Sequence, residues 1–218
     1  MNVAAPSRTL AVLPVKRFEL AKTRLGDALS DADRRRLARA MVADVLDALI
    51  AAPELGGVAV ITNEPAVAEL ARDAGAAVLA DPREAGQSAA ALVGIARARA
   101  GGFDRALLVP GDCPALDGAT LRARLAPPTP APSVTIVADR HGLGTNALLL
   151  APPDVIEPGF GEGSFERHRQ RAQAAGAEWR VAALPALELD IDTPADLAAL
   201  RRSAAGGGSR TGAVLDSL

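Results

Sequence analysis

Short apolar runs and amphipathic segments alternate along the chain from Thr9 onward. Thr9–Val15 is an unbroken apolar run of the kind that forms a buried strand. After a polar stretch, apolar side chains recur at four-residue spacing over 37–49, which predicts a helix. Ser30 is a suitable N-cap for this helix, with Asp33 in its first turn and Pro53 beyond its end. The chain therefore opens with a strand, a loop and a helix.

The same alternation continues for the next fifty residues. It predicts strands at 57–62, 77–80 and 105–110 and helices at 65–74 and 87–100. The predicted strands are almost continuously apolar, as expected for a parallel sheet with helices on both faces. The fold class is therefore α/β, with a doubly wound, mostly parallel sheet.

The pattern changes in the last hundred residues. A short helix is expected at 119–125, then a proline-rich stretch at 127–132 and two strand-like runs at 134–139 and 146–151. The connection between these two runs is too short for a crossover helix, so they predict an antiparallel hairpin or a locally mixed sheet. A helix at 164–175, a strand ending at 188–192 and a helix at 194–202 complete the expected fold.

The folded part is expected to be one domain over residues 9–203. Residues 1–8 precede it as an N-terminal extension. Residues 204–218 contain three consecutive glycines and no periodic apolar face, which predicts a flexible C-terminal tail. No internal repeat is visible in the sequence.

Composition narrows the class of protein. The chain has 218 residues, of which 49% are hydrophobic and 23% charged, and these values exclude disorder, collagen and coiled coil. A net charge of -2 and the lack of a long basic block argue against a dedicated nucleic-acid binder. The apolar runs are too short to span a membrane. With Cys113 as the single cysteine and no secretory signal, we expect a cytoplasmic protein that acts on small molecules.

In open α/β sheets ligands bind beyond the carboxyl ends of the strands, so the segments that leave the strands are the first candidates for a functional site. Four cations follow the first strand, and two of them, Lys16 and Lys22, are the only lysines in the chain. Such a segment suits a polyphosphate. It has neither the dinucleotide-binding nor the Walker A pattern, and a solvated basic loop is the alternative. The candidate nucleotide-binding residues here are Leu13, Pro14, Val15, Lys16 and Lys22, with Arg17 and Arg24 nearby.

Three aspartates form a second candidate group. Asp112 follows the strand at 105–110, while Asp190 and Asp192 lie two apart on the expected strand at 188–192, which places both on one face. Hard oxygen ligands without Cys or His favour Mg²⁺, and Mg²⁺ in turn implies phosphates. The structural alternative is that Asp192 and Thr193 cap the helix at 194–202.

Two glycine-containing segments complete the candidates. Ser164 lies where a helix begins after a glycine-rich approach, which favours an anion site, and His168 lies one turn further along. For His168 alone, a surface or capping role is the alternative. Gly86, Gln87 and Ser88 open another helix and are candidates for contact with a base or ribose.

Taken in order, the segments LPVKRFELAKTRL, GDCPAL, RHGLGTNALLL, FGEGSF and ELDIDTPADL resemble the CofC/FbiD guanylyltransferases, which belong to the MobA-like nucleotidyltransferases with a Rossmann-like fold. That family prepares the phosphorylated three-carbon precursor of coenzyme F-420. The resemblance implies transfer of GMP from GTP to phosphoenolpyruvate, giving enolpyruvyl-diphospho-5'-guanosine and pyrophosphate. It also implies that Asp112, Asp190 and Asp192 hold Mg²⁺, and that Lys22 and its neighbours receive the GTP phosphates. Phosphoenolpyruvate would bind to Thr145, Gly161 and Ser164.

Several alternatives stay open at the level of sequence. The acceptor can be 2-phospho-L-lactate or 3-phosphoglycerate, and the chain can be another MobA-like nucleotidyltransferase. A non-catalytic nucleotide-binding module is the alternative from a different class. Neither a nucleic acid nor a membrane is expected as a partner. The expected form is a monomer or homodimer that can hand its product to the next enzyme.

Overall fold

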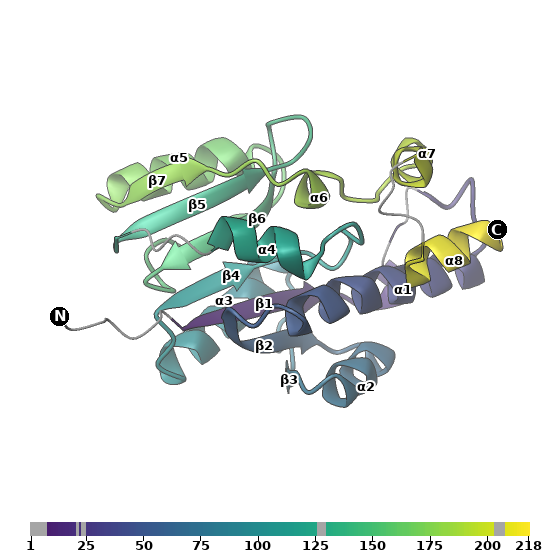
Figure 1. Ribbon diagram of the computed structural model, residues 1–218, viewed down its shortest axis with the longest axis horizontal. Helices are drawn as coiled ribbons and strands as arrows, with labels where there is room; N and C mark the ends of the chain where they lie inside the picture. Colours follow the sequence, from purple (N-terminus) through teal and green to yellow (C-terminus); the bar gives the residue numbers. More distant parts are fainter. Residues whose placement is uncertain (1–7, 21, 23–24, 126–129, 203–207) are drawn as a thin grey trace.

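The computed structural model describes residues 8–20, 22, 25–125, 130–202 and 208–218. Seven strands of this part of the chain form one sheet in the order β3-β2-β1-β4-β6-β5-β7 (Figure 1). Their bounds are β1 Thr9–Val15, β2 Leu55–Thr62, β3 Ala77–Leu79, β4 Arg105–Leu108, β5 Ser133–Ala138, β6 Thr145–Ala151 and β7 Glu178–Val181.

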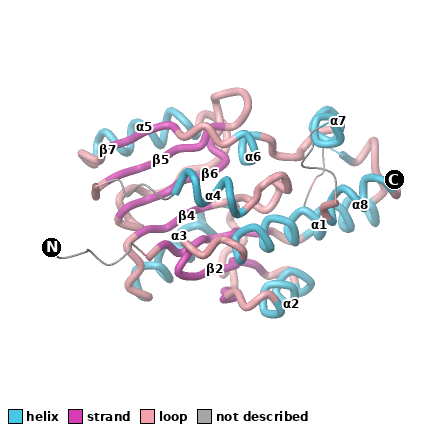
Figure 2. Tube along the Cα trace, in the orientation of Figure 1, coloured by secondary structure: helices cyan, strands magenta, loops and turns pink. Residues whose placement is uncertain are grey.

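Helices cover both faces of the sheet, as Figures 1 and 2 show. On one face, α1, α2 and α4 bury one set of apolar side chains, and α3 and α5 bury a second set on the opposite face. A third cluster joins α1 to α7 and α8 beyond the sheet. The bounds are α1 Asp31–Ile50, α2 Pro65–Asp73, α3 Gln87–Ala100, α4 Gly118–Leu125, α5 Ser164–Ala174, α6 Pro185–Glu188, α7 Pro194–Arg202 and α8 Arg210–Asp216, with a 3₁₀ turn, η1, at Phe18–Leu20. The α/β fold class is confirmed.

One strand of the sheet runs against the others. β1 pairs in parallel with β2 and β4, β2 with β3, and β5 with β7. β6 is antiparallel to both β4 and β5, so the predicted mixed region is confirmed. Because of this reversal, β6 begins at the edge of the sheet where the parallel strands end. The first residues of β6 thereby join the edge at which α/β proteins bind ligands.

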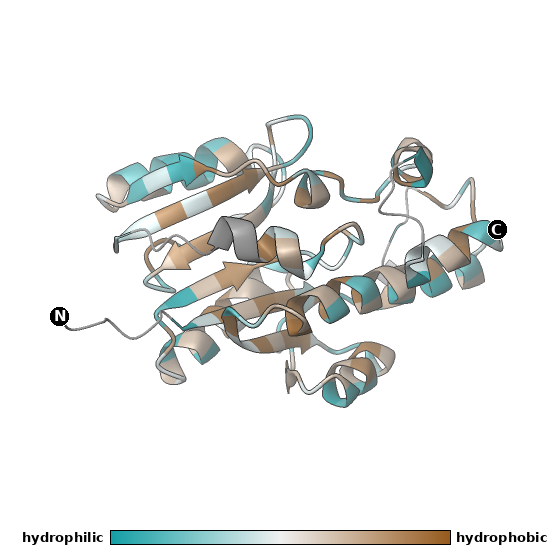
Figure 3. Ribbon diagram, viewed as in Figure 1, coloured by the Kyte–Doolittle hydropathy of each residue, from teal (hydrophilic) through white to brown (hydrophobic). Residues whose placement is uncertain are grey.

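The central strands are buried on both sides, as their apolar runs predict. Figure 3 shows them in brown between helices whose outer faces are hydrophilic. Packing is closest where α3 crosses β1. A Cβ atom on Gly94 would lie 2.1 Å from Cγ1 of Val12, so only glycine allows this approach. At the start of α1, the Ser30 hydroxyl accepts a hydrogen bond from the backbone N–H of Asp33, which confirms the predicted cap.

The predicted strand at 188–192 is wrong. The last strand of the sheet is β7, and Pro185 begins the short helix α6 before this segment. Residues 189–192 belong to no strand, and the backbone N–H of Ile191 donates to the carbonyl of Asp112. Ile191 is buried in the third cluster. The alternation of polar and apolar residues therefore reflects the burial of Ile191 in this cluster and not pairing in the sheet.

The predicted flexible tail is also wrong over Arg210–Asp216, which forms α8. Ser209 caps this helix, and the Asp44 carboxylate on α1 accepts hydrogen bonds from the backbone N–H groups of Arg210 and Thr211. Leu215 is buried in the third cluster, which also contains Leu37 and Met41 of α1. A helix this short has too few positions to display a periodic face. The predictions for residues 1–7, 126–129 and 203–207 lie outside the described part of the chain.

Within the described ranges, no helix combines the length and apolarity that crossing a bilayer requires.

Candidate active site

A pocket of about 390 Å³ lies at the edge of the sheet where the parallel strands end. Its walls come from the segments that follow β1, β2, β3 and β4, together with α1 and the start of α3. Of the residues predicted to bind nucleotide, the pocket is lined by Pro14, Val15, Lys16, Lys22, Gly86 and Gln87. Leu13 is instead fully buried in the core. Ser88 does not line the pocket, and its hydroxyl accepts a hydrogen bond from the backbone N–H of Phe160. Thr23 and Arg24 lie outside the described residues.

Lys22 lies at the inner end of this pocket between two carboxylates. Its Nζ is 2.7 Å from Oδ2 of Asp112 and 2.8 Å from Oδ1 of Asp192, and its side chain is only 6% exposed. Burial by itself lowers the pKa of Lys22, but the charges of the two aspartates outweigh it, so the pKa is raised. Lys22 is therefore a fixed cation. Its backbone has φ of 55°, a conformation that is costly for a residue with a side chain.

Two of the three predicted aspartates contact Lys22, and the third, Asp190, lies close enough to Asp112 for that charge to affect its pKa. Oδ1 of Asp112 is buried and has no hydrogen-bond partner among the described residues. Oδ1 of Asp190 lies 3.4 Å from the Nδ2 donor of Asn146, at the start of β6. Burial, and then the charge of Asp112, raises the pKa of Asp190. The negative charges of Asp112 and Asp192 thus act on Asp190, and one buried oxygen of Asp112 is unsatisfied among the described residues.

The chemistry of this donor set fits Mg²⁺, although the described residues do not form a preformed cage. No three acidic, histidine or cysteine side chains of the described chain are arranged to hold a metal ion together. The ammonium of Lys22 holds Asp112 and Asp192 instead. Mg²⁺ in phosphate-transfer sites is commonly held by one or two carboxylates, with substrate phosphates and waters completing its ligands. The unpartnered Oδ1 of Asp112 is the atom that best suits such a role.

Capping of α7 does not explain the position of Asp192. The Thr193 side chain accepts from the backbone N–H of Asp196, and Oδ2 of Asp196 accepts from the N–H and hydroxyl of Thr193. This is a capping box with Pro194 at the first helical position. The carboxylate of Asp192 contacts Lys22 instead, so the helix is capped without it.

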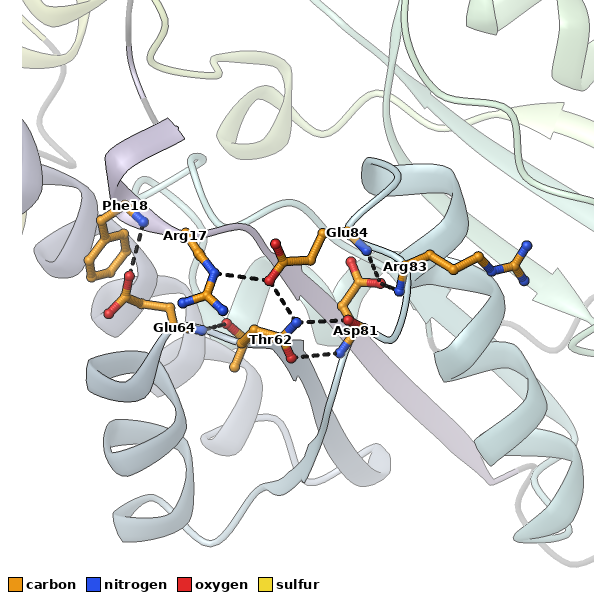
Figure 4. A network of polar contacts seen from close by, with 8 residues as sticks. Arg17, Phe18, Thr62, Glu64, Asp81, Arg83 and Glu84 are labelled. Carbon is orange, nitrogen blue, oxygen red and sulfur yellow. Dashed lines mark hydrogen bonds and ion pairs between the residues drawn. The ribbon is translucent and has the colours of Figure 1, made fainter.

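A polar network forms the opposite wall of the pocket (Figure 4). Oε1 of Glu84 accepts hydrogen bonds from Nε of Arg17 at 2.9 Å and from Nδ2 of Asn63 at 2.7 Å. Asn63 also exchanges hydrogen bonds with the backbone of Asp81. Hydrogen bonds from Asn63 and then Arg17 lower the pKa of Glu84, so this carboxylate stays ionised. The network follows β1, β2 and β3, on the side of β1 away from Asp112.

Sequence analysis missed Asn63, Asp81 and Glu84 in this wall. Asn63 directly follows β2, and Asp81 lies two residues after β3. Both therefore occupy strand exits, where α/β proteins bind ligands, and this position is a signal that the sequence contains. The pairing of Glu84 with Arg17 depends instead on the folded loop.

Thr145, Gly161 and Ser164 lie in a second group beside the start of β6. The Thr145 hydroxyl is 3.0 Å from Nδ1 of His168. Ser164 opens α5 and is fully buried, and its hydroxyl has no hydrogen-bond partner among the described residues. Gly161 and Gly163 have φ of 104° and 66°, so the approach to α5 requires glycine at both positions. An unpartnered hydroxyl at an uncapped helix N-terminus favours an anion.

This fold, with cations and carboxylates at the exits of its parallel strands, is similar to the folds of solved proteins named as nucleotidyl transferases or nucleotide-diphospho-sugar transferases. Similar structures include a protein from Desulfovibrio desulfuricans named after the nucleotide-diphospho-sugar transferases, with a TM-score of 0.76, 20% identity and coverage of 97% of this chain and 95% of that one. A nucleotidyl transferase from Methanothermobacter has a TM-score of 0.64 at 20% identity and covers 89% of this chain and 96% of its own.

The chain belongs to the family of CofC-like guanylyl transferases, whose pattern it matches over residues 9–212. It is 46% identical over 214 residues to a phosphoenolpyruvate guanylyltransferase of Conexibacter woesei, covering 96% of each chain. A phosphoenolpyruvate guanylyltransferase of Sphaerobacter thermophilus is 39% identical over 201 residues, covering 92% of this chain and 96% of that one. The resemblance inferred from the motifs is thereby confirmed.

Proposed function

We propose that this guanylyltransferase transfers GMP from GTP to phosphoenolpyruvate, producing enolpyruvyl-diphospho-5'-guanosine and pyrophosphate. The observation that carries the proposal is the buried ammonium of Lys22, held by Asp112 and Asp192 in the pocket at the sheet edge. The names of relatives that match nearly the whole chain support the choice of acceptor.

The proposed reaction is an in-line displacement at the α-phosphorus of GTP. A phosphate oxygen of phosphoenolpyruvate forms a new P–O bond to that phosphorus, and the bond to the bridging oxygen of the β-phosphate breaks. The electron pair leaves with pyrophosphate. The attacking phosphate is already ionised at neutral pH, so no general base is needed. The protein has to align the two substrates and neutralise charge on the leaving group.

Lys22 supplies the fixed positive charge for this purpose. An ammonium has three N–H donors, and the two contacts with Asp112 and Asp192 use two of them. The third is left for a phosphate oxygen of the nucleotide. Because the two aspartates orient the ammonium before substrate binds, little reorganisation is needed during the reaction. Lys16 is exposed at the pocket rim and adds charge where the phosphates enter.

We propose that Mg²⁺ binds together with the GTP phosphates and is held by Asp112, Asp190 and Asp192. The ion would neutralise phosphate charge and support the departure of pyrophosphate. The unpartnered Oδ1 of Asp112 and the raised pKa of Asp190 support a cation at this place. The lack of a preformed metal cage accords with an ion that arrives bound to its nucleotide.

The opposite wall of the pocket supports guanine as the base. Guanine presents two donors, N1–H and the N2 amino group, on its pairing edge, whereas adenine presents an acceptor at N1. The Glu84 carboxylate lines the pocket and is fixed through one oxygen by Arg17 and Asn63. A carboxylate accepts from both guanine donors and repels the adenine acceptor. Gly86 and Gln87 line the pocket next to this carboxylate in sequence.

The second group of residues supports an acidic acceptor. Phosphoenolpyruvate carries only hydrogen-bond acceptors on its phosphate and carboxylate. The hydroxyls of Thr145 and Ser164, with the open backbone at Gly161, offer donors beside the start of β6. Arg167 holds this loop by donating to the carbonyls of Gly159 and Glu162. We propose that the acceptor binds here, next to Asn146 and the aspartates.

The test is a grid of pyrophosphate-release assays with Mg²⁺. GTP, ATP and CTP are each combined with phosphoenolpyruvate, 2-phospho-L-lactate and 3-phosphoglycerate. We expect release with GTP and phosphoenolpyruvate. Release only with another acceptor or nucleotide would replace that substrate in the proposal. Binding of GTP to folded protein without release in any pair would favour the non-catalytic nucleotide-binding module.

A further inference from the structure

His168 has no role in the proposed reaction, yet it lies at the centre of the acceptor group. It is fully buried on α5, one turn after Ser164 and on the same helix face. Its Nδ1 lies 3.0 Å from Oγ1 of Thr145, and its Nε2 accepts a hydrogen bond of 2.8 Å from the backbone N–H of Gly159. One imidazole thus joins the start of β6, the glycine-rich loop and α5.

These contacts assign the tautomer of the ring. The backbone N–H of Gly159 is a donor only, so Nε2 of His168 must present its lone pair. Burial, followed by the charges of Arg171 and Arg167, lowers the pKa of His168 to about 4. The ring is therefore neutral at physiological pH and carries its one proton on Nδ1. That proton is donated to the hydroxyl oxygen of Thr145.

The direction of this hydrogen bond decides what Thr145 can offer a ligand. A threonine hydroxyl has one hydrogen and rotates to suit its partners. When its oxygen receives the Nδ1 proton of His168, its own hydrogen is directed elsewhere and is available as a donor. An anionic acceptor presents only lone pairs. The Thr145 hydroxyl is therefore already oriented as a donor before the acceptor binds.

We infer that His168 is a positioning residue that fixes the Thr145 hydroxyl as a hydrogen-bond donor to the anionic three-carbon acceptor. The inference rests on the proposed function for the identity of that acceptor. The ring of Phe160 packs edge-on against the imidazole, with 5.4 Å between the ring centroids, and helps to hold it in place. The backbone of Phe160 is in turn held by Ser88 at the start of α3. Ser88 thereby connects the nucleotide pocket to the acceptor group without lining the pocket itself.

Two substitutions separate the two hydrogen bonds of the ring. In His168→Asn the side-chain amide nitrogen lies near the former Nδ1 and can still donate to Thr145. In His168→Gln the amide lies near the former Nε2 and can still accept from Gly159, but nothing replaces the donor at Nδ1. We expect H168Q to raise the KM for phosphoenolpyruvate about tenfold with the KM for GTP unchanged, and H168N to stay within about threefold of wild type.

The exposed histidine provides the matched control. His141→Gln makes the same change outside the buried group, and we expect both KM values to match wild type. Thr145→Val in combination with H168Q tests the route of the effect. Once the hydroxyl is gone, H168Q should add no further increase. Equal effects of H168N and H168Q, or a parallel rise in the KM for GTP, would show a purely structural role and overturn the inference.

A readout without turnover separates this inference from the proposed function. Imidazole ¹⁵N NMR identifies which ring nitrogen carries the proton, and H141Q assigns the signals because the chain has only two histidines. We expect a neutral His168 protonated on Nδ1, with a signal that shifts when phosphoenolpyruvate is added. A proton on Nε2 overturns the inference even in an active enzyme. The expected tautomer and shift in a protein that releases no pyrophosphate would keep the positioning role and reject the reaction.

Discussion

At the scale of single residues, three groups of the candidate site have contacts that leave one atom unsatisfied. Lys22 has a donor in excess of its two carboxylates, Asp112 has a buried oxygen without a partner, and the Ser164 hydroxyl has none either. Leaving a buried polar atom unsatisfied is costly in a folded protein. Such atoms are explained when a ligand completes their hydrogen bonds or coordination. At Asp112 and Ser164, a ligand bound in the two candidate groups would satisfy these atoms.

Replacing Asp112 tests the cation-binding role. Asp112→Asn keeps the shape of the side chain and removes its charge. We therefore expect kcat to fall by about a hundredfold or more and the Mg²⁺ concentration for half-maximal activity to rise. The matched control is Asp117→Asn in the same loop, where asparagine can replace aspartate as the acceptor from the backbone of Thr120. Wild-type turnover in D112N, with the fold intact by circular dichroism, would remove Asp112 from the machinery.

Replacing Glu84 tests how the base is recognised. Glu84→Gln removes the ionised acceptor and introduces a donor, so we expect kcat/KM for GTP to fall about tenfold while that for ATP falls less. Inosine triphosphate lacks the N2 amino group. Its kcat/KM should therefore be lower than that of GTP in wild type, and the difference between the two nucleotides should be small in the variant. An unchanged ratio of GTP to ATP would place base recognition elsewhere in the pocket.

His168 also gives the fold a defined dependence on pH. Its pKa is about 4 in the folded chain, and its ordinary value is 6.5. Between these values the unfolded chain binds the proton and the folded chain does not, so the free energy of unfolding falls as pH drops from about 6.5 to 4. The contribution amounts to about 3 kcal/mol at most, from about 1.4 kcal/mol for each pKa unit. Denaturant unfolding should therefore show that the free energy of unfolding falls less between pH 6.5 and 4 in H168Q than in wild type. Equal losses would contradict a neutral, buried imidazole.

At the scale of secondary-structure elements, α8 ties the end of the chain to α1, as seen at the right of Figure 1. Leu215 is 3% exposed in the third cluster, so Leu215→Ala should lower the free energy of unfolding by about 2 kcal/mol or more. The helix lies away from the pocket, so kcat and both KM values should stay near wild type when measured well below the unfolding temperature. The same substitution at exposed Leu143 is the stability control. A loss of activity without a loss of stability would instead place α8 in the function of the site.

Elements with strong local signals were predictable from the sequence. β1 and α3 were predicted with the bounds that the structure has, because apolar runs and helical periodicity arise within the element itself. β7 was missed because its four residues are only partly buried and alternate weakly. The segment at 188–192 shows alternation without sheet pairing, since Ile191 packs into the third cluster while Asp192 contacts Lys22. Periodicity thus identifies which side chains are buried but does not identify the partner that buries them.

At the scale of the whole molecule, the reversal of β6 brings the two candidate groups together. Asp112 follows β4, and Asn146 lies at the start of the antiparallel neighbour β6, where its side chain contacts Asp190. The rule that ligands bind at strand exits was enough to place Lys22 and Asp112 at one edge. The contacts of Glu84 and His168 could not be derived in this way, because each joins segments that are far apart in sequence. Such contacts depend on loop conformation in the folded chain.

The most direct measurement is ³¹P NMR of the purified protein with GTP, phosphoenolpyruvate and Mg²⁺. Transfer of GMP predicts two coupled resonances of an unsymmetrical diphosphate that appear together with pyrophosphate, at the expense of both substrates. The D112N variant should give neither signal on the same timescale. Formation of GDP with inorganic phosphate, or pyrophosphate without the coupled pair, would contradict guanylyl transfer to the three-carbon phosphate.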